Sequence, residues 1–354
     1  MESPFAFVAE PHRGVFNLSA HETMGQDPIF PPEIMIHDIL DLMTCPSCDG
    51  DVYINTSPRE ERELVDETMS CLRCGACIPV KGGVPRFAGR LTDQQQIAES
   101  FGLQWRYREE GRFEQSTLYG LSAEQEVDAC FQALGITSAD LAGKTFLDAG
   151  CGDGFLLRLL SQYPARFVGI DIHSSIVRTY EACRPFPNIT IVEADILRPP
   201  LRHLSFDFVW SEGVIVHTPD PKGAFKSLSG LVKPGGKLYV WVYPSQPLSI
   251  YQRVRDLLVA PYLLPRPALL FLTYLLALPI FLAAKPYAAW KRRRGSAAVP
   301  KPSVRTVAFG LYDNLSPRYQ TRHTVDEVAG WFKEFGFSQL IQTGLIGFSG
   351  TKTS

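Results

Sequence analysis

The stretch Leu147-Asp148-Ala149-Gly150-Cys151-Gly152-Asp153-Gly154 decides the fold of this chain. An apolar, strand-like run leads into it and a helical pattern follows it, so its glycines occupy a strand-to-helix turn. Glycine allows the sharp turn and the close approach of a ligand, and the helix start offers free N–H groups to an anionic group such as a carboxylate. The spacing is G-x-G-x-G, whereas dinucleotide sites use G-x-G-x-x-G. The preceding Asp148 favours an ammonium or sulfonium ligand over a pyrophosphate.

Two further acidic residues close the next two strand-like runs. Asp171 ends the run that begins at Phe167, where a carboxylate can accept hydrogen bonds from two ribose hydroxyls. Asp195 ends the run that begins at Ile191, where it can reach an adenine amino group. Each acid alone is also compatible with a helix N-cap or a solvated strand end. Because ligands bind outside the carboxyl ends of such strands, three acids around one glycine loop favour a ligand site.

Strand and helix patterns alternate through the middle of the chain. Helices are expected at 154–163, 174–183 and 221–231, and strands at 145–149, 167–172, 189–194, 206–211 and 237–243. This alternation predicts an α/β fold with a doubly wound, mainly parallel sheet. Towards the end of the chain, a capping box from Thr324 to Glu327 predicts a helix that Gly336 ends, followed by two more strands.

The chain resembles the class I S-adenosylmethionine (SAM)-dependent methyltransferases, in particular the branch with the ubiquinone and menaquinone methyltransferases, in segments 147–154, 168–171, 193–201, 206–221 and 231–240. The resemblance implies a seven-stranded Rossmann-like sheet and SAM as the cofactor. It also implies SAM contacts from Asp148, Gly150, Gly152 and Gly154, ribose binding by Asp171, adenine binding by Asp195, and a methyl-transfer mouth lined by Glu212 and Gly213. This branch often has two consecutive histidines where this chain has Val216-His217, so the acceptor chemistry stays open.

Four cysteines form two CxxC pairs. Cys45 and Cys48 make the first pair, and Cys71 and Cys74 make the second after a gap of 22 residues. Two such knuckles direct four thiolates at one ion, which predicts a structural zinc site in a zinc ribbon. A redox dithiol would need only one pair.

The other cysteines are interpreted more simply. Cys77 is an alternative to Cys74 with poorer spacing, and the three further along the chain are expected to be ordinary thiols. The segment 78–85 resembles small zinc modules related to activators of tRNA and protein methyltransferases. That resemblance implies docking or substrate presentation rather than catalysis.

Residues 247–300 interrupt the alternation with an apolar insertion. The stretch Ala268–Ala284 would extend about 26 Å as a helix, against a hydrocarbon core of roughly 30 Å, and Pro279 is expected to interrupt it. The run Lys291-Arg292-Arg293-Arg294 behind Trp290 is typical of an anchor at a membrane surface. Three interpretations stay open: a lid that touches an apolar acceptor or a membrane interface, a fully buried lid, and a transmembrane helix.

Methyl transfer from SAM is an in-line displacement, and an oxygen nucleophile also needs a base. His217 follows the fourth strand at the cofactor end of the sheet and is the first candidate, with a loop-capping role as the alternative. The segment 312–323 is expected to be a loop that closes over the site, from which Tyr312 and His323 are further candidates. A plain helix-entry loop fits that segment equally well.

The sequence thus predicts a loosely ordered arm, a zinc ribbon, a helical cap, a SAM-binding core, the apolar insertion and a closing segment, at 1–35, 36–90, 91–141, 142–246, 247–300 and 301–354. The net charge of −2 over 354 residues argues against a general polyanion binder. We therefore expect a small or lipid-like acceptor and no nucleic acid, although RNA methylation and a non-catalytic SAM-binding adaptor are alternatives. Residues 1–20 lack a signal-peptide core, so the expected location is the cytoplasm, with membrane contact through 257–294.

Overall fold

A seven-stranded mixed sheet forms the centre of the protein, in the order β10-β11-β9-β8-β5-β6-β7. The computed structural model describes residues 40–54, 68–87, 92–110, 122–245, 264–293 and 303–353, so the predicted arm lies outside it. The strands are β5 (Thr145–Ala149), β6 (Arg166–Asp171), β7 (Ile189–Glu193), β8 (Phe206–Glu212), β9 (Val232–Trp241), β10 (Phe337–Thr343) and β11 (Gly347–Lys352). The first five pair in parallel, and β11 is antiparallel to both of its neighbours. The predicted fold class is confirmed.

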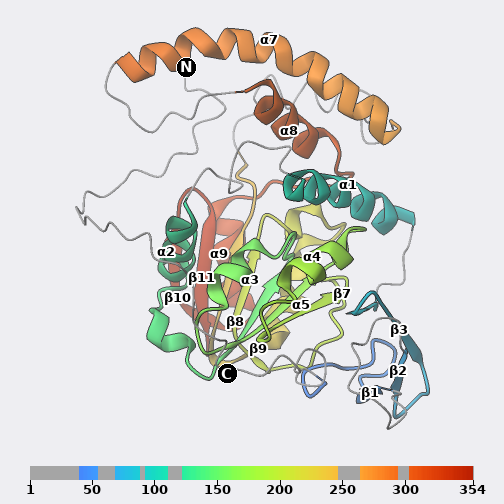
Figure 1. Cartoon of the computed structure of the whole chain (residues 1–354). Helices are drawn as coiled ribbons and strands as arrows, with labels where there is room; N and C mark the ends of the chain where they lie inside the picture. Colours follow the sequence, from blue (N-terminus) through green and yellow to red (C-terminus); the bar gives the residue numbers. More distant parts are fainter. Residues whose placement is uncertain are drawn as a thin grey trace.

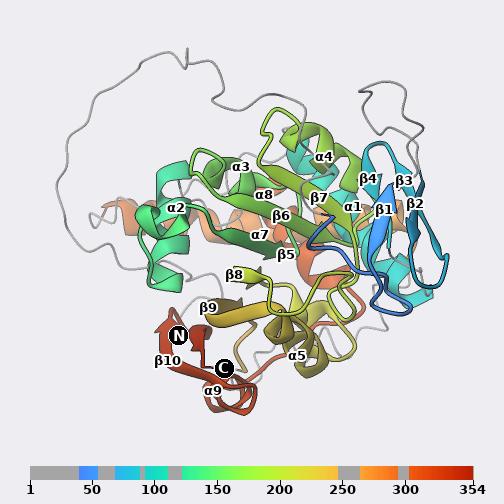
Figure 2. The same cartoon turned by 90° about the horizontal axis from the view of Figure 1, so that it is seen from below.

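Helices cover both faces of this sheet (Figure 2). One face carries α2 (Ala123–Leu134), α3 (Phe155–Leu160) and α4 (Ile176–Cys183), and the other carries α5 (Pro221–Leu231) and α9 (Val325–Glu334). Successive side chains of a strand point to opposite faces, so Phe146 and Leu147 belong to two different cores. The predicted capping box of α9 is present, with Thr324 Oγ1 accepting from the Glu327 N–H at 3.2 Å.

The cysteine module, which we define as the described residues 40–54 and 68–87, packs beside the β7 edge (Figure 1). Its antiparallel strands are β1 (Val52–Ile54), β2 (Thr68–Cys71), β3 (Cys77–Lys81) and β4 (Val84–Pro85). Met69 and Val80 of this module share one apolar core with the α5 face of the central sheet. Arg86 bridges to Glu193 at the end of β7, and the two side chains form an ion pair of 2.7 Å. The module is therefore an added layer of the central domain.

Three helices stack above the carboxyl ends of the parallel strands (Figure 1). α1 (Thr92–Glu109) lies directly on the loops after the strands, where the Ala98 carbonyl accepts from the Ser174 N–H at 3.0 Å. α8 (Val304–Leu315) lies above α1, and α7 (Arg266–Arg293) lies across the top. These helices make the roof of the cofactor end of the sheet.

The roof corrects two expectations. Pro279 does not interrupt the helical stretch, because α7 continues through it as the curved helix of Figure 1. A proline removes one backbone hydrogen bond, but packing of Ala277 and Ile280 on either side against α8 holds the helix together, and the loss bends it. Tyr312 is not on a loop either, because α8 includes it and ends only at Leu315.

Candidate cofactor and active site

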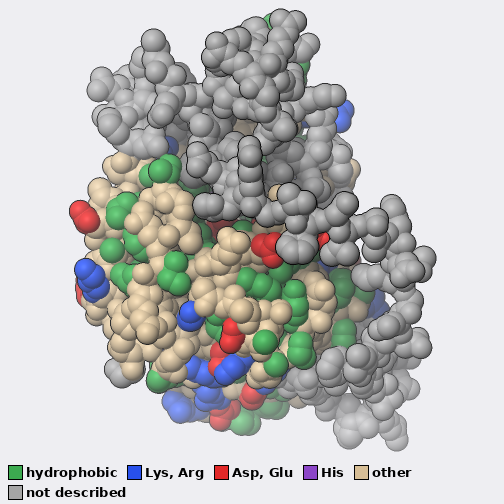
Figure 3. All heavy atoms as spheres, turned by 90° about the vertical axis from the view of Figure 1, so that its left-hand side faces the viewer, with side chains coloured by type: hydrophobic (Ala, Val, Ile, Leu, Met, Phe, Trp, Pro, Cys, Tyr) green, Lys and Arg blue, Asp and Glu red, His purple; other side chains and the backbone are tan. Residues whose placement is uncertain are grey.

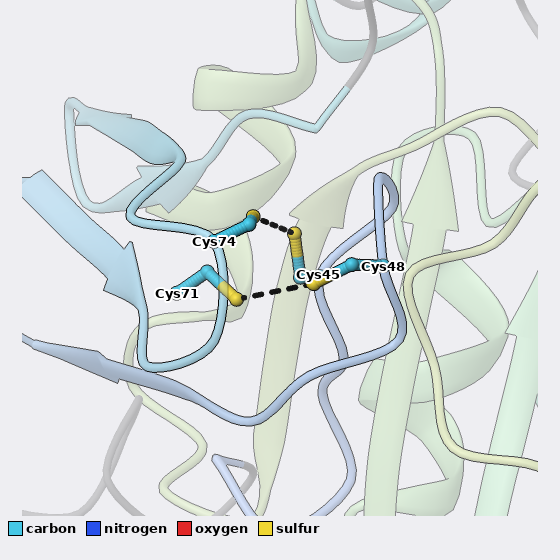
Figure 4. A group of neighbouring side chains, drawn as sticks. All are labelled: Cys45, Cys48, Cys71 and Cys74. Carbon is cyan, nitrogen blue, oxygen red and sulfur yellow. Dashed lines mark hydrogen bonds between the residues drawn. The ribbon is translucent and has the colours of Figure 1, made fainter.

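The four predicted metal-ligand cysteines meet at one point of the cysteine module (Figure 4). Their sulfur atoms all lie within 4.8 Å of one another, with Cys45 Sγ 3.7 Å from Cys74 Sγ and Cys48 Sγ 3.5 Å from Cys71 Sγ. A tetrahedral Zn²⁺ with Zn–S bonds of about 2.3 Å would separate its sulfurs by about 3.8 Å. The spacing therefore fits a zinc ion held by four thiolates.

The electrostatics of the group agree with a bound cation. Backbone N–H groups of Cys74 and Arg73 lower the pKa of Cys71 to about 6, which favours its thiolate. The Gly50 N–H acts in the same direction on Cys48, but burial and the neighbouring thiols raise the pKa of Cys48 to about 12. Four thiols this close cannot all ionise without a positive charge between them. The alternative ligand Cys77 is exposed, and its Sγ points to the Gly75 carbonyl.

The glycine loop follows β5 at the centre of the sheet. Gly150 and Gly152 have φ angles of 103° and 53°, a backbone conformation that glycine adopts without strain. A side chain on Gly150 would lie 2.2 Å from Val214, and one on Gly152 would lie 2.7 Å from the Trp105 ring. Gly154, with a φ of 71°, is the N-cap of α3. The loop is thus held between α1 above and the loop after β8 beside it.

Carboxylates gather around this loop. Asp148 is buried at the end of β5, and its pKa is raised well above the usual range by burial and then by Asp171, Glu212 and Asp153. Burial raises the pKa of Glu212 to about 8, with a smaller contribution from Glu126. The neighbours that shift Asp148 are all acidic, so its negative charge is disfavoured in the ligand-free protein. A cation bound among these groups would lower their pKa values and be held by them.

Asp171 and Asp195 also make local hydrogen bonds. Asp171 Oδ2 accepts from the Gly152 N–H at 2.9 Å, and its Oδ1 accepts from the Ile172 N–H at 2.7 Å. Asp195 Oδ1 accepts from the Leu197 N–H at 2.9 Å in the turn after β7. Each acid therefore accepts backbone hydrogen bonds in the turn that follows its strand, and neither is the N-cap of a helix. Both still lie at the carboxyl ends of successive strands, as a ligand site requires.

His173 supports the glycine loop and was missed by the sequence reasoning. Its ring is buried, and its Nε2 lies 2.8 Å from the Gly152 carbonyl, which also accepts from the Thr179 hydroxyl at 2.8 Å. On the other side, Arg108 of α1 forms an ion pair of 3.3 Å with Asp153. The position of His173 two residues after Asp171 was the available signal.

His217 lies beneath α1 at the end of the sheet. Its Nδ1 is 2.8 Å from the Tyr319 carbonyl, which can only accept, so the Nδ1 proton donates to it. Nε2 is then the acceptor that faces the Tyr243 hydroxyl at 3.3 Å. Phe101 packs its ring edge to face with His217, at a centroid distance of 4.9 Å. Tyr243 was not among the predicted site residues, although it closes a predicted strand.

The other two catalytic candidates have different contacts. His323 Nδ1 pairs with Glu327 at 3.0 Å and its Nε2 lies 2.9 Å from the Thr321 hydroxyl, so the ring holds the start of α9. Tyr312 is buried in the roof with Leu269 and Leu315, and burial raises its pKa. Only the first part of the expected loop, Tyr312–Leu315, belongs to α8, and residues 316–323 lie outside the helices.

The face shown in Figure 3 bears on the nucleic-acid alternative. Lys and Arg side chains near its lower edge lie among Asp and Glu side chains, and hydrophobic side chains are scattered above them. Nucleic-acid binding surfaces concentrate positive charge along one face. Among the residues described on this side, charge is mixed instead.

Comparisons with known proteins agree with this geometry. The family "Methyltransferase domain" matches residues 147–240. A ubiquinone biosynthesis O-methyltransferase of Neisseria meningitidis serogroup C is 31% identical over 131 residues, which are 36% of this chain and 54% of the relative. An uncharacterized methyltransferase of Mycobacterium tuberculosis is 33% identical over 117 residues, which are 32% of this chain and 59% of the relative.

Among solved structures, the magnesium protoporphyrin IX methyltransferase of Synechocystis with bound SAM is similar at 15% identity and a TM-score of 0.45, covering 75% of this chain and 99% of that chain. The chain spans about half the length of the Neisseria relative, at 54%. The family match begins at the glycine loop and ends in β9, so it contains the carboxylates and His217. Residues 147–240 of this chain are therefore a methyltransferase domain.

Proposed function

We propose that this chain transfers the methyl group of SAM to a small, lipid-like acceptor. The observation that carries the proposal is the group of carboxylates around the glycine loop, with Asp148 buried among them. SAM carries two positive charges, on its ammonium and its sulfonium. The carboxylates of Asp148 and Glu212 lie near further acidic side chains, and together these groups would attract a cation. The matching methyltransferase domain and the ubiquinone O-methyltransferase relatives support both parts of the proposal.

In this proposal, different residues bind different parts of SAM. The glycine loop, which turns sharply at Gly150, Gly152 and Gly154, and the start of α3 would hold the methionine part of SAM. Asp171 and Asp195, at the carboxyl ends of two successive strands, would bind the ribose and the adenine through lone pairs of their carboxylates. SAM supplies an electrophilic methyl group, and the protein orients the acceptor towards it and removes a proton.

His217 acts through Tyr243 in this mechanism. An acceptor hydroxyl that attacks the methyl gives its proton to the Tyr243 oxygen, while the Tyr243 proton passes to His217 Nε2. Nδ1 keeps its proton and donates it in the hydrogen bond to the Tyr319 carbonyl, which holds Nε2 in the accepting form. His217 afterwards releases the proton to solvent. Tyr243 is therefore the catalytic residue in this mechanism. His217 positions the Tyr243 hydroxyl and accepts its proton.

The cysteine module holds zinc in a structural role. Four cysteine ligands fill a tetrahedral site, so no coordination position is left for a substrate. The module packs on the β7 edge, away from the Tyr243–His217 pair at the end of β9. Its contribution is to stabilise the domain.

The proposal is tested by SAM titration followed by turnover. Isothermal titration should show binding of one SAM per chain, and incubation with hydroxylated aromatic and lipid extracts should release S-adenosylhomocysteine. Tyr243→Phe should lower kcat by roughly 100-fold or more and leave SAM affinity unchanged. A chain without SAM affinity would contradict the proposal. SAM binding without a methylated product from any extract would favour the adaptor alternative.

A further inference from the structure

α7 has an apolar face that docks on the protein. Leu269, Thr273 and Ala277 are fully buried, at spacings of four residues that place them on one side of the helix. They pack against α8, where Leu315 and Ala308 belong to the same small cores. α7 lies across the roof (Figure 1), and these contacts fix it between Leu269 and Ala277.

The opposite side of α7 is equally apolar and has nothing on it among the described residues. Phe271, Leu275, Leu278 and Leu282 are 71%, 59%, 50% and 57% exposed. Their spacings of four, three and four residues place them in one stripe, which we call the outer stripe. Soluble proteins expose large apolar side chains singly, and a continuous stripe of them marks a surface for another apolar body.

The charged residues around α7 indicate what kind of partner the outer stripe binds. No acidic residue occurs between Asp256 and Asp313. The same segment contains eight basic residues: Arg266, Lys285, Lys291, Arg292, Arg293, Arg294, Lys301 and Arg305. An apolar stripe with basic residues and no acidic ones is complementary to a phospholipid surface that carries negative charge.

The packing of α7 against the protein also indicates whether the helix would span a bilayer or lie along its surface. Among the described residues, α7 is the one helix long and apolar enough to cross a membrane. A spanning helix would need lipid all round, but Thr273 is fully buried against the protein and Arg266 donates to the Gln96 carbonyl of α1 at 2.7 Å. The protein thus occupies one side of α7 and leaves the other side for the membrane.

We propose that α7 lies in the plane of an anionic phospholipid surface, with the outer stripe inserted among the lipids. Membrane binding of this kind does not rest on the proposed methyl transfer.

Vesicle flotation of the full chain tests the proposal. The probes are vesicles of phosphatidylcholine alone and of phosphatidylcholine mixed with phosphatidylglycerol. The chain should bind the mixed vesicles, bind the neutral ones more weakly, and lose affinity as salt rises. The double variant Phe271→Ser/Leu275→Ser should bind about 100-fold more weakly, at about tenfold for each apolar side chain removed.

The matched control is Leu72→Ser/Leu345→Ser, which removes side chains that are 69% and 49% exposed elsewhere on the protein. It should bind vesicles like the unaltered chain, and both variants should keep the same melting temperature and SAM affinity. Absence of vesicle binding, or equal binding by both variants, would overturn the proposal. Self-association without vesicle binding would assign the outer stripe to a second copy, and resistance to alkaline extraction from membranes would assign it to a span. SAM titration of the same samples separates these results from a failure of the proposed enzyme activity.

Discussion

The cysteine module and α7 both lie outside the central sheet. They differ in whether their apolar side chains are buried or exposed. Met69 and Val80 of the module are buried and share a core with the central domain. Phe271 and Leu275 of α7 are more than half exposed. Both regions contain large apolar side chains, so the presence of such side chains alone does not distinguish a structural layer from a binding surface. The two regions differ in whether the rest of the chain covers their apolar side chains.

This difference has consequences for stability. Substitutions in the module should destabilise the whole domain, because its core is continuous with that of the sheet. Substitutions in the outer stripe should leave folding unchanged and alter only what α7 binds. The following predictions test that division, from the largest expected effect to the smallest.

Loss of the metal should have the largest effect. Cys45→Ser removes one of four ligands, and because metal binding is coupled to folding, the free energy of unfolding should fall by roughly 3 kcal/mol or more. Elemental analysis and thermal melting measure both outcomes. Cys77→Ser is the control, since Cys77 lies outside the group, and should retain one zinc per chain. Equal zinc loss in the two variants would contradict the assigned ligand set.

The ion pair that joins the module to β7 should come next. Arg86→Ala removes the ion pair of Glu193, whose side chain is only 2% exposed. This change should cost about 3 kcal/mol in denaturant unfolding. The double variant Arg86→Ala/Glu193→Gln should lose less than Arg86→Ala alone, because no buried charge remains. An equal or greater loss in the double variant would show that the ion pair does not fasten the module.

The two sides of α7 should give the sharpest contrast, and its exposed side should give the smallest effect. Leu269→Ala empties a fully buried position and should cost about 3 kcal/mol, whereas Leu275→Ala, at 59% exposed, should change stability by less than about 0.5 kcal/mol. Both variants remove the same atoms from the same helix. Similar losses in urea unfolding would mean that the outer stripe is covered in the folded protein.

Much of the sheet could be predicted because its signals are local. The expected strand 145–149 coincides with β5, and the other strands shift by a few residues. Short apolar runs and a glycine loop can be recognised without knowledge of distant residues. The acids around the loop were found for the same reason, since each closes its own strand.

The roof and the catalytic pair could not be predicted in the same way. Pro279 breaks a local rule, and only packing against α8 shows why the helix continues. The partners of His217 are 26 and 102 residues away in sequence, so nothing near His217 points to Tyr243 or to the Tyr319 carbonyl. The helix containing Tyr312 had a local signal, because Ser303 caps its start through the Thr306 N–H at 3.0 Å. That signal was missed.

The most direct test of the central claim is a SAM titration at several pH values. Glu212 has a pKa of about 8 without ligand, so it is mostly protonated at neutral pH and must release its proton to hold a cation. Affinity for SAM should therefore rise between about pH 6 and pH 7.5, below the range where the ligand's own amino group loses its charge at about 8. Binding should release protons into the buffer, and Glu212→Gln should make the rise shallower. No binding, or affinity that falls as the pH rises in this range, would contradict a SAM site built on buried carboxylates.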